Sequence, residues 1–192
     1  VLVDGCARGV AIGIQGYPSR GVDEPSSQLN VRGSREGFVE VIRRNMALIR
    51  RRIKSPTLVF EMSVMGERSN TDICLCYLSD KVSPALLEQV RRRLGEVKLN
   101  TILESGYIQP FLEGSGGWFF SECGTCERPD SFAAKLYEGR VGILVDGTPF
   151  ALTVPYLFIE NFQTMDDYTQ KPFYALFIRM LRLTAYFITL FL

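Results

Sequence analysis

Residues 57–78, TLVFEMSVMGERSNTDICLCYL, hold the two strands on which the predicted fold depends. Leu58 to Val64 is an apolar run of strand length, and the polar stretch 66–70 turns the chain. In the second strand, Asp72 to Leu78, side chains alternate between two faces, so Ile73, Leu75 and Tyr77 share one of them. The stretch therefore predicts a β-hairpin.

Helical patterns lie on both sides of this hairpin. Upstream, apolar residues recur every three or four positions over residues 34–54, with Ser34 as the expected N-cap and Pro56 after the end. Downstream, Ser83-Pro84 is typical of a helix start, and the pattern continues to residue 97. These two helices are expected to pack on the sheet that the hairpin begins.

Shorter elements follow towards the C-terminus. We expect a short helix over 101–105, an irregular loop over 114–130, and a helix over 129–138 whose inward residues include Tyr137. A second hairpin, residues 141–154, turns at Asp146-Gly147, a preferred turn pair. Residues 1–16 also resemble a hairpin.

The last twenty residues, FYALFIRMLRLTAYFITLFL (173–192), end in ten residues without charge. A membrane-spanning helix needs about 20 apolar residues, and positive charges mark its cytosolic flank. Lys171, Arg179 and Arg182 provide such charges. We expect the beginning of a transmembrane helix here, cut short in its span; the alternative is a core helix of a soluble protein.

These patterns predict an α/β fold: a mixed β-sheet with packed helices, followed by the beginning of a transmembrane helix. We divide the chain into residues 1–25, a hairpin remnant of an upstream α/β subdomain, residues 26–165, an α/β subdomain, and residues 166–192, a membrane-approach helix.

Composition narrows the possible functions. The net charge of +1 argues against bulk binding to nucleic acid, and the complete absence of histidine excludes histidine-based catalysis or metal binding within these residues. Five cysteines in irregular spacing, with no signal peptide, suggest reduced thiols. No nucleophile–base pair can be proposed, so we expect no enzyme activity and no bound cofactor or metal.

Three motifs leave other interpretations open. Cys123 and Cys126 form a CxxC, which with Cys74 and Cys76 would offer a zinc or redox site, although buried inert thiols are the favoured interpretation. The loop from Arg32 to Gly37 is basic and glycine-rich at an expected helix start, where an anion can bind; the competing interpretation pairs its arginines with acids such as Glu24. The basic run 43–54 is typical of a solvated face, or of a surface for an acidic neighbour or anionic lipid.

Several longer strings resemble the A subunits of bacterial spore germinant receptors, the GerA family. They are RGSREGFVEVIRRNMALIRRRIKSPTL (32–58), GERSNTDICLCYL (66–78), LESGYIQPFLE (103–113), ERPDSFAAKLYEGRVGILVDGTPFALTVPYLFIENFQ (127–163) and FIRMLRLTAYFITLFL (177–192). Cys126 stands where the family usually has threonine, which weakens any family-wide role for the CxxC. Stage V sporulation protein AF shares this domain and is the alternative within the family.

The resemblance implies a non-enzymatic cytosolic domain that acts in nutrient-triggered spore germination by assembling or gating a membrane ion channel. It implies B and C subunits as partners, homo-oligomerisation through the A subunit, and the cytosolic side of the spore inner membrane. At helix starts and turns we expect residues that hold subdomain or subunit contacts through charge-assisted hydrogen bonds. They are Arg32, Gly33, Arg35, Glu36, Glu127, Arg128, Pro129, Asp130, Asp146 and Gly147.

Overall fold

The computed structural model describes residues 21–25, 27–28, 33–113, 121–164, 167 and 170–191. The hairpin expected over residues 1–16 and the candidate Arg32 lie outside these residues.

A five-stranded sheet forms the centre of the fold, in the order β1-β2-β4-β5-β3. Its strands are β1 (Leu58–Met65), β2 (Thr71–Leu78), β3 (Gly124–Cys126), β4 (Val141–Val145) and β5 (Ala151–Val154). The predicted α/β architecture of a sheet with packed helices is confirmed; each of the four strand pairings is antiparallel, where we expected a mixed sheet.

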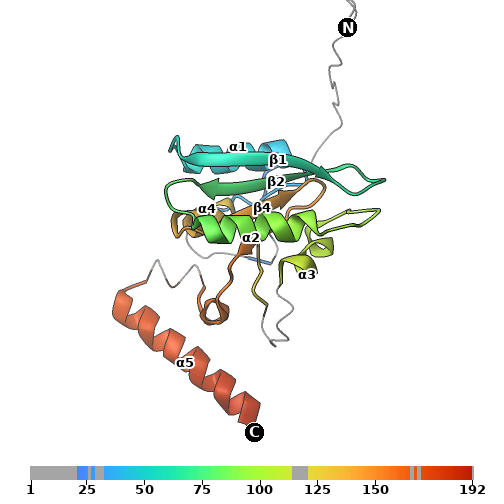
Figure 1. The fold of residues 1–192 in the computed structure, drawn as a ribbon. Coiled ribbons are helices and arrows are strands. Elements are labelled where there is room, and N and C mark those ends of the chain that lie inside the picture. The colour runs from blue at the N-terminus through green and yellow to red at the C-terminus, as the bar shows by residue number, and fades with distance from the viewer. Residues whose placement is uncertain are drawn as a thin grey trace, which may run out of the picture.

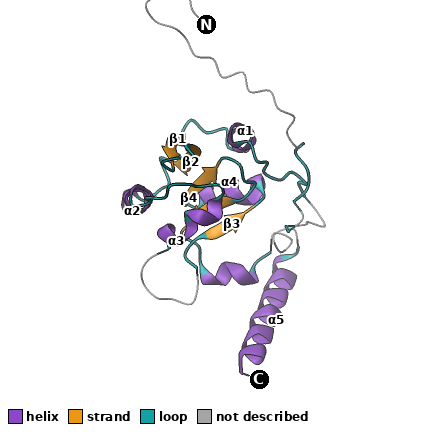
Figure 2. Cartoon of the chain, turned by 90° about the vertical axis from the view of Figure 1, so that its right-hand side faces the viewer, coloured by secondary structure: helices purple, strands orange, loops and turns teal. Residues whose placement is uncertain are grey.

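Helices cover both faces of this sheet (Figures 1 and 2). Helices α1 (Ile42–Arg52) and α4 (Pro129–Tyr137) pack on one face, and α2 (Pro84–Gly95) and α3 (Gln109–Leu112) pack on the other. Side chains alternate along β2, so Ile73, Leu75 and Tyr77 enter the core on the α2 side while Cys74 and Cys76 enter the core on the α1 side. Two apolar layers therefore enclose the sheet.

The first helix begins at Ile42, so the expected start at Ser34 was wrong. Residues 34–41 are not helical, because their backbone groups are bound elsewhere: Gly37 N–H donates to the Asp23 carbonyl at 2.9 Å and Phe38 N–H to the Glu127 carbonyl at 2.8 Å. Phe38 is buried against Phe132, with ring centroids 5.5 Å apart in an edge-to-face arrangement. Tertiary contacts override the helical pattern here.

Three other expectations need correction. Residues 101–104 are not helical, because Ile102 binds the turn after β1 through its backbone, and a short 3₁₀ turn, η1 (Ser105–Tyr107), follows instead. Strand β3 lies within the expected loop and pairs with β5. The side chain of Tyr137 points outward and is 52% exposed, so the inward face of α4 consists of Phe132, Ala133 and Leu136.

After β5 comes a second 3₁₀ segment, η2 (Phe158–Phe162), and then the long helix α5 (Pro172–Phe191). Helix α5 lies apart from the sheet layers, on the opposite side of the domain from α1 and β1 (Figures 1 and 2). By length and composition α5 could cross a membrane. Ala175 is its one buried residue among those described.

Candidate interaction site

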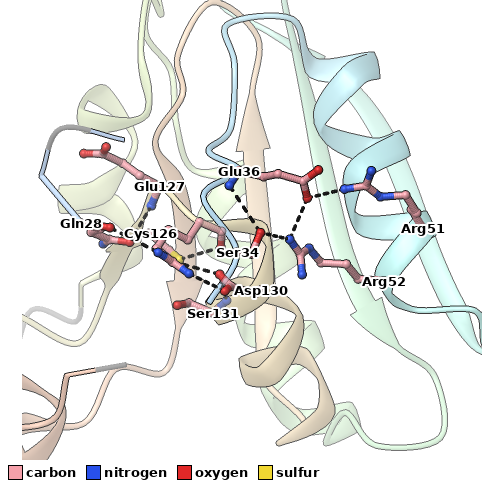
Figure 3. Close-up of polar contacts among 10 residues, drawn as sticks. Gln28, Ser34, Glu36, Arg51, Arg52, Cys126, Glu127, Asp130 and Ser131 are labelled. Carbon is pink, nitrogen blue, oxygen red and sulfur yellow. Dashed lines mark hydrogen bonds and ion pairs between the residues drawn. The ribbon is translucent and has the colours of Figure 1, made fainter. Parts of the chain in front are cut away.

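The segment 33–41, which leads into α1, lies along α4 and gathers most of the charged candidates around it (Figure 3). Gly37 sits where no larger residue fits: a Cβ atom there would come within 2.9 Å of the Asp23 carbonyl oxygen. The close approach of these two backbone stretches fixes the path of the segment, and it explains why glycine occupies this position.

Arg128 and Asp130 form the buried centre of the site. The Arg128 side chain is 1% exposed and donates through Nε to Asp130 Oδ1 at 3.1 Å and through a terminal nitrogen to Oδ2 at 2.5 Å. A second nitrogen donates to the Gln28 carbonyl at 3.4 Å. Burial acts to raise the pKa of Asp130, but the hydrogen bond from Arg128 and that from Ser131 N–H outweigh it, so the pKa is lowered. The pair is therefore charged at neutral pH.

Glu127 and Gln28 extend this contact to the preceding segment. Ser27 donates its hydroxyl to the Glu127 carboxylate, and Glu127 N–H donates to Gln28 Oε1 at 3.4 Å. Pro129 occupies the first turn of α4, where its missing N–H costs nothing. The Glu-Arg-Pro-Asp string thus starts α4 and, at the same place, holds residues 27–28, about a hundred positions earlier in the chain.

Glu36 joins the segment to the end of α1. Its carboxylate accepts hydrogen bonds from Arg51 and, at 2.8 Å, from Arg52, which also donates to Ser34 Oγ at 2.7 Å. These bonds, that from Arg51 first, lower the pKa of Glu36. Glu36 is one-third exposed, so we expect these ion pairs to orient the segment more than they stabilise the fold.

The turn at Asp146-Gly147 caps α1 from a distance of 104 residues along the chain. The N-cap residue Val41 has no side-chain acceptor, and Asp146 Oδ1 accepts the Ile42 N–H at 3.0 Å in its place. Gly147, at φ +88°, donates its N–H to the Glu40 carbonyl at 2.8 Å. A negative charge is thereby placed at the positive end of a helix that has no acid in its own first turn.

In its described part, residues 33–37, the basic loop lacks the helix start that the anion site considered above requires. Its Arg35 is 75% exposed and lies 3.7 Å from Glu24, as the competing interpretation expected. Gly33 has φ +125° and turns the chain into an extended segment, so the premise that this loop opens a helix was wrong. The described part of the loop therefore lacks the helix N-terminus that would attract an anion.

The two cysteines of the CxxC lie on opposite sides of the sheet. Cys123 belongs to the core on the α2 side and Cys126 to the core on the α1 side, so the CxxC thiols cannot form one site. Burial raises the pKa of Cys123 to about 12, and it also raises the pKa of Cys76 and Cys126. Within the described residues no group of three potential ligands could hold a metal ion. The favoured interpretation of buried inert thiols agrees with this arrangement for these cysteines.

A second charged cluster, which sequence reasoning missed, connects α4 to η2. Glu160 accepts hydrogen bonds from Arg140 and from Leu157 N–H, the latter at 2.8 Å, and lies 3.3 Å from the Lys135 ammonium. Burial acts to raise the pKa of Glu160, but these donors and charges outweigh it and lower the pKa. Lys135 is in the last turn of α4, so this acid fastens η2 to the helix that Arg128 begins.

A third cluster connects Asp167, which follows η2 in the chain, to α5. Asp167, with a side chain 5% exposed, accepts hydrogen bonds from Arg179 at 3.1 Å and Arg182 at 2.9 Å; we call these three residues the Asp167 clamp. Burial acts to raise the pKa of Asp167, but its arginine partners, Arg182 first, outweigh it and lower the pKa. From the sequence we expected Arg179 and Arg182 beside a membrane but did not predict Asp167 as their partner, because only the fold brings Asp167 to them.

Comparisons with known proteins agree on one group. The model of the family described as Bacillus/Clostridium GerA spore germination protein matches residues 1–192. Spore germination protein KA of Bacillus subtilis (strain 168) is 40% identical over 190 residues, 99% of this chain and 35% of that protein. Stage V sporulation protein AF of the same organism is 34% identical over 183 residues, 95% of this chain and 37% of that protein.

A solved structure shares the fold. The crystal structure of the N-terminal domain of the A subunit of the Bacillus megaterium spore germinant receptor GerK3 aligns with a TM-score of 0.51 and 39% identity. The alignment covers 64% of this chain and 97% of that domain. The chain spans little more than a third of the length of the two Bacillus subtilis relatives named above.

Proposed function

Because this chain belongs to the GerA family of spore germination proteins, whose model matches residues 1–192, we propose that it acts without catalysis as the cytosolic domain of a germinant receptor A subunit. Its role is to pass a nutrient-triggered change to a membrane ion channel, by gating that channel or assembling its subunits. It works in the spore inner membrane, with this segment on the spore-core side, together with B and C subunits and further copies of itself.

One observation carries this proposal beyond family membership. A continuous series of buried or half-buried contacts runs from the segment before α1 to α5. It begins at the Arg128–Asp130 pair, follows α4 to Lys135, crosses to Glu160 on η2, and ends where η2 and the Asp167 clamp hold α5. Rigid elements joined by charge-assisted hydrogen bonds can transmit a displacement, because small shifts in close-packed contacts are not absorbed locally.

The test needs the remainder of a membrane subunit, so residues 1–192 replace the matching region of Spore germination protein KA in Bacillus subtilis. We would reconstitute the chimera in liposomes with its partner subunits and record ion flux, and we would follow nutrient-triggered germination of the chimeric spores. Glu160→Gln should alter flux and slow germination, because it weakens the link between α4 and η2. The matched control is Glu88→Gln, an acid on α2 that is 72% exposed.

Equal flux from both variants, at equal protein levels in the membrane, would remove the transmission mechanism and leave a scaffold role. The sporulation branch is a second candidate, supported by the 34% identity to Stage V sporulation protein AF. A matching chimera in that protein separates the two branches. Each chimera is tested in the strain that lacks its parent protein, and the strain whose lost function is restored identifies the branch to which this domain is functionally equivalent.

A further inference from the structure

Helix α5 has two chemically different faces. Ala175, Arg179, Arg182 and Tyr186 lie on the face towards η2, at helical spacings of three and four. The opposite face carries large apolar side chains, and the described part of the structure leaves them exposed. Phe173 is 84% exposed, and the others are Leu176, Phe177, Met180 and Leu181.

The arginine face is attached firmly to the domain. Arg182 donates to Asp167 and also to the Phe162 carbonyl at 3.1 Å. One turn further on, the ring of Tyr186 packs against Phe158 and Phe162, with centroids 6.0 and 5.3 Å away. The helix is thus fixed at two successive points along η2, which sets its direction relative to the sheet (Figure 1).

This attachment is incompatible with a span that begins at Pro172. An α-helix rises about 1.5 Å per residue, so Arg182 would lie about 15 Å along such a span. That depth is the midplane of a hydrocarbon core about 30 Å thick. Arginine is among the costliest residues to place there, and Asp167 would have to follow or lose both of its partners.

We propose that residues 172–182 of α5 lie on the surface of a lipid bilayer as an interfacial helix, with the apolar face at 173–181 inserted among the headgroups and upper acyl chains. Residues 183–186 stay against η2 at the edge of the membrane, and the part that enters the hydrocarbon core begins after Tyr186. This inference rests on the membrane placement in the proposed function and adds the boundary and the lipid-binding face. It does not depend on ion conduction.

The occupant of the apolar face is a bilayer for three reasons. The face continues without interruption into the uncharged residues 183–191, so whatever surrounds those residues also reaches Phe177. Aromatic side chains with a lysine at their start, here Phe173, Tyr174 and Lys171, are typical of the membrane–water interface. Two more apolar side chains near α5 are exposed: Leu157, the N-cap of η2, and Ile159 within η2.

The experiment measures depth in vesicles of phosphatidylethanolamine and phosphatidylglycerol. The chain has one tryptophan, Trp118, which is replaced by phenylalanine so that a single new tryptophan reports, in Phe177→Trp or in Ile188→Trp. Lipids brominated near the headgroup should quench the reporter at 177 best, and the reporter at 188 should be quenched best by lipids brominated deeper in the acyl chain. Quenching of the 177 reporter by deep bromines would overturn the proposal in favour of a single span from Pro172.

A binding assay with the same vesicles tests the face itself. Phe177→Glu should weaken co-sedimentation roughly tenfold or more, since it removes a large buried apolar group from the interface. Met62→Glu, a change at a half-exposed apolar residue on edge strand β1, should leave binding unchanged. Vesicle binding with an unquenched 177 reporter would overturn the interfacial helix while keeping the membrane placement. Absence of vesicle binding would overturn both.

Discussion

Removing Asp130 and removing Arg128 should lower the free energy of unfolding by different amounts, so the two substitutions together test the Arg128–Asp130 pair. In Asp130→Ala the guanidinium, 1% exposed, loses two hydrogen bonds and a carboxylate partner, and removing one partner of a buried ion pair costs about 3–5 kcal/mol of unfolding free energy. In Arg128→Met the charge itself is gone. Asp130 is then left 22% exposed, with the Ser131 N–H and water as partners, so we expect a cost of about 1–3 kcal/mol.

The assay is urea unfolding of the chain, followed by circular dichroism, with thermal unfolding as a second readout. For a protein of this size 1 kcal/mol shifts Tm by about 2–4 °C, so Asp130→Ala should lower Tm by roughly 6–20 °C. The double variant Arg128→Met/Asp130→Ala should be more stable than Asp130→Ala alone, because the buried guanidinium is removed together with its carboxylate partner. Glu88→Ala, which removes an exposed pair, serves as the control and should change stability by under about 1 kcal/mol.

Two results would refute this reasoning. If Asp130→Ala cost no more than Arg128→Met, the guanidinium would not depend on that carboxylate. If the two changes were additive in the double variant, the pair would contribute nothing as a pair, and the start of α4 would be held by apolar packing alone.

Three further predictions concern stability. Asp146→Ala should cost about 1 kcal/mol by removing the acceptor of the Ile42 N–H, whereas Asp146→Asn keeps an oxygen there and should cost less; urea midpoints that are equal would refute the cap. Gly142→Ala should cost about 1–3 kcal/mol or more, because the new Cβ would meet Phe132 Cζ at 2.1 Å, and an unchanged Tm would contradict the packing. Glu36 and four other carboxyls have lowered pKa values. Their contribution to the free energy of unfolding is therefore complete above the ordinary pKa values of 3.8 for Asp and 4.5 for Glu, and it is lost as pH falls through the folded pKa. The urea midpoint should drop on acidification to about pH 3, and by less in Glu36→Gln.

Local patterns predicted the elements whose structure is decided locally. Strands β1 and β2 are largely apolar runs of strand length on either side of a polar turn, and α2 has Pro84 at its start and a regular apolar face, so each was located within one or two residues. The start of α1 was not decided locally. Ser34 and Glu36 are typical of a helix start, but in the fold they bind Arg52 at the other end of α1. The helix begins instead at Ile42, whose N–H donates to Asp146.

The same reason explains which functional candidates could be found. Asp130 and Asp146 were proposed because they stand beside a helix start and in a turn, which are features of sequence. Strand β3, three residues long without periodicity, exists because β5 offers it an edge. Glu160 and Asp167 had no local signal, since their arginines lie 12 to 20 residues away, and only the return of the chain brings them into contact.

Ion pairs hold this domain both where the chain enters it and where the chain leaves it. The two places differ in how far the arginine is exposed to solvent. At the entry, Arg128 is almost fully enclosed, so separating the buried guanidinium from the Asp130 carboxylate is costly and should be rare. At the exit, Arg182 is 36% exposed while Asp167 is buried, so water or a lipid phosphate can compete for the arginine at a smaller cost. When α5 is displaced, the ion pairs of the Asp167 clamp should therefore break before the Arg128–Asp130 pair does. Asp167→Asn should loosen α5 without unfolding the sheet, seen as faster hydrogen exchange in η2 and α5 alone; exchange that rises equally in β2 and β4 would contradict this order.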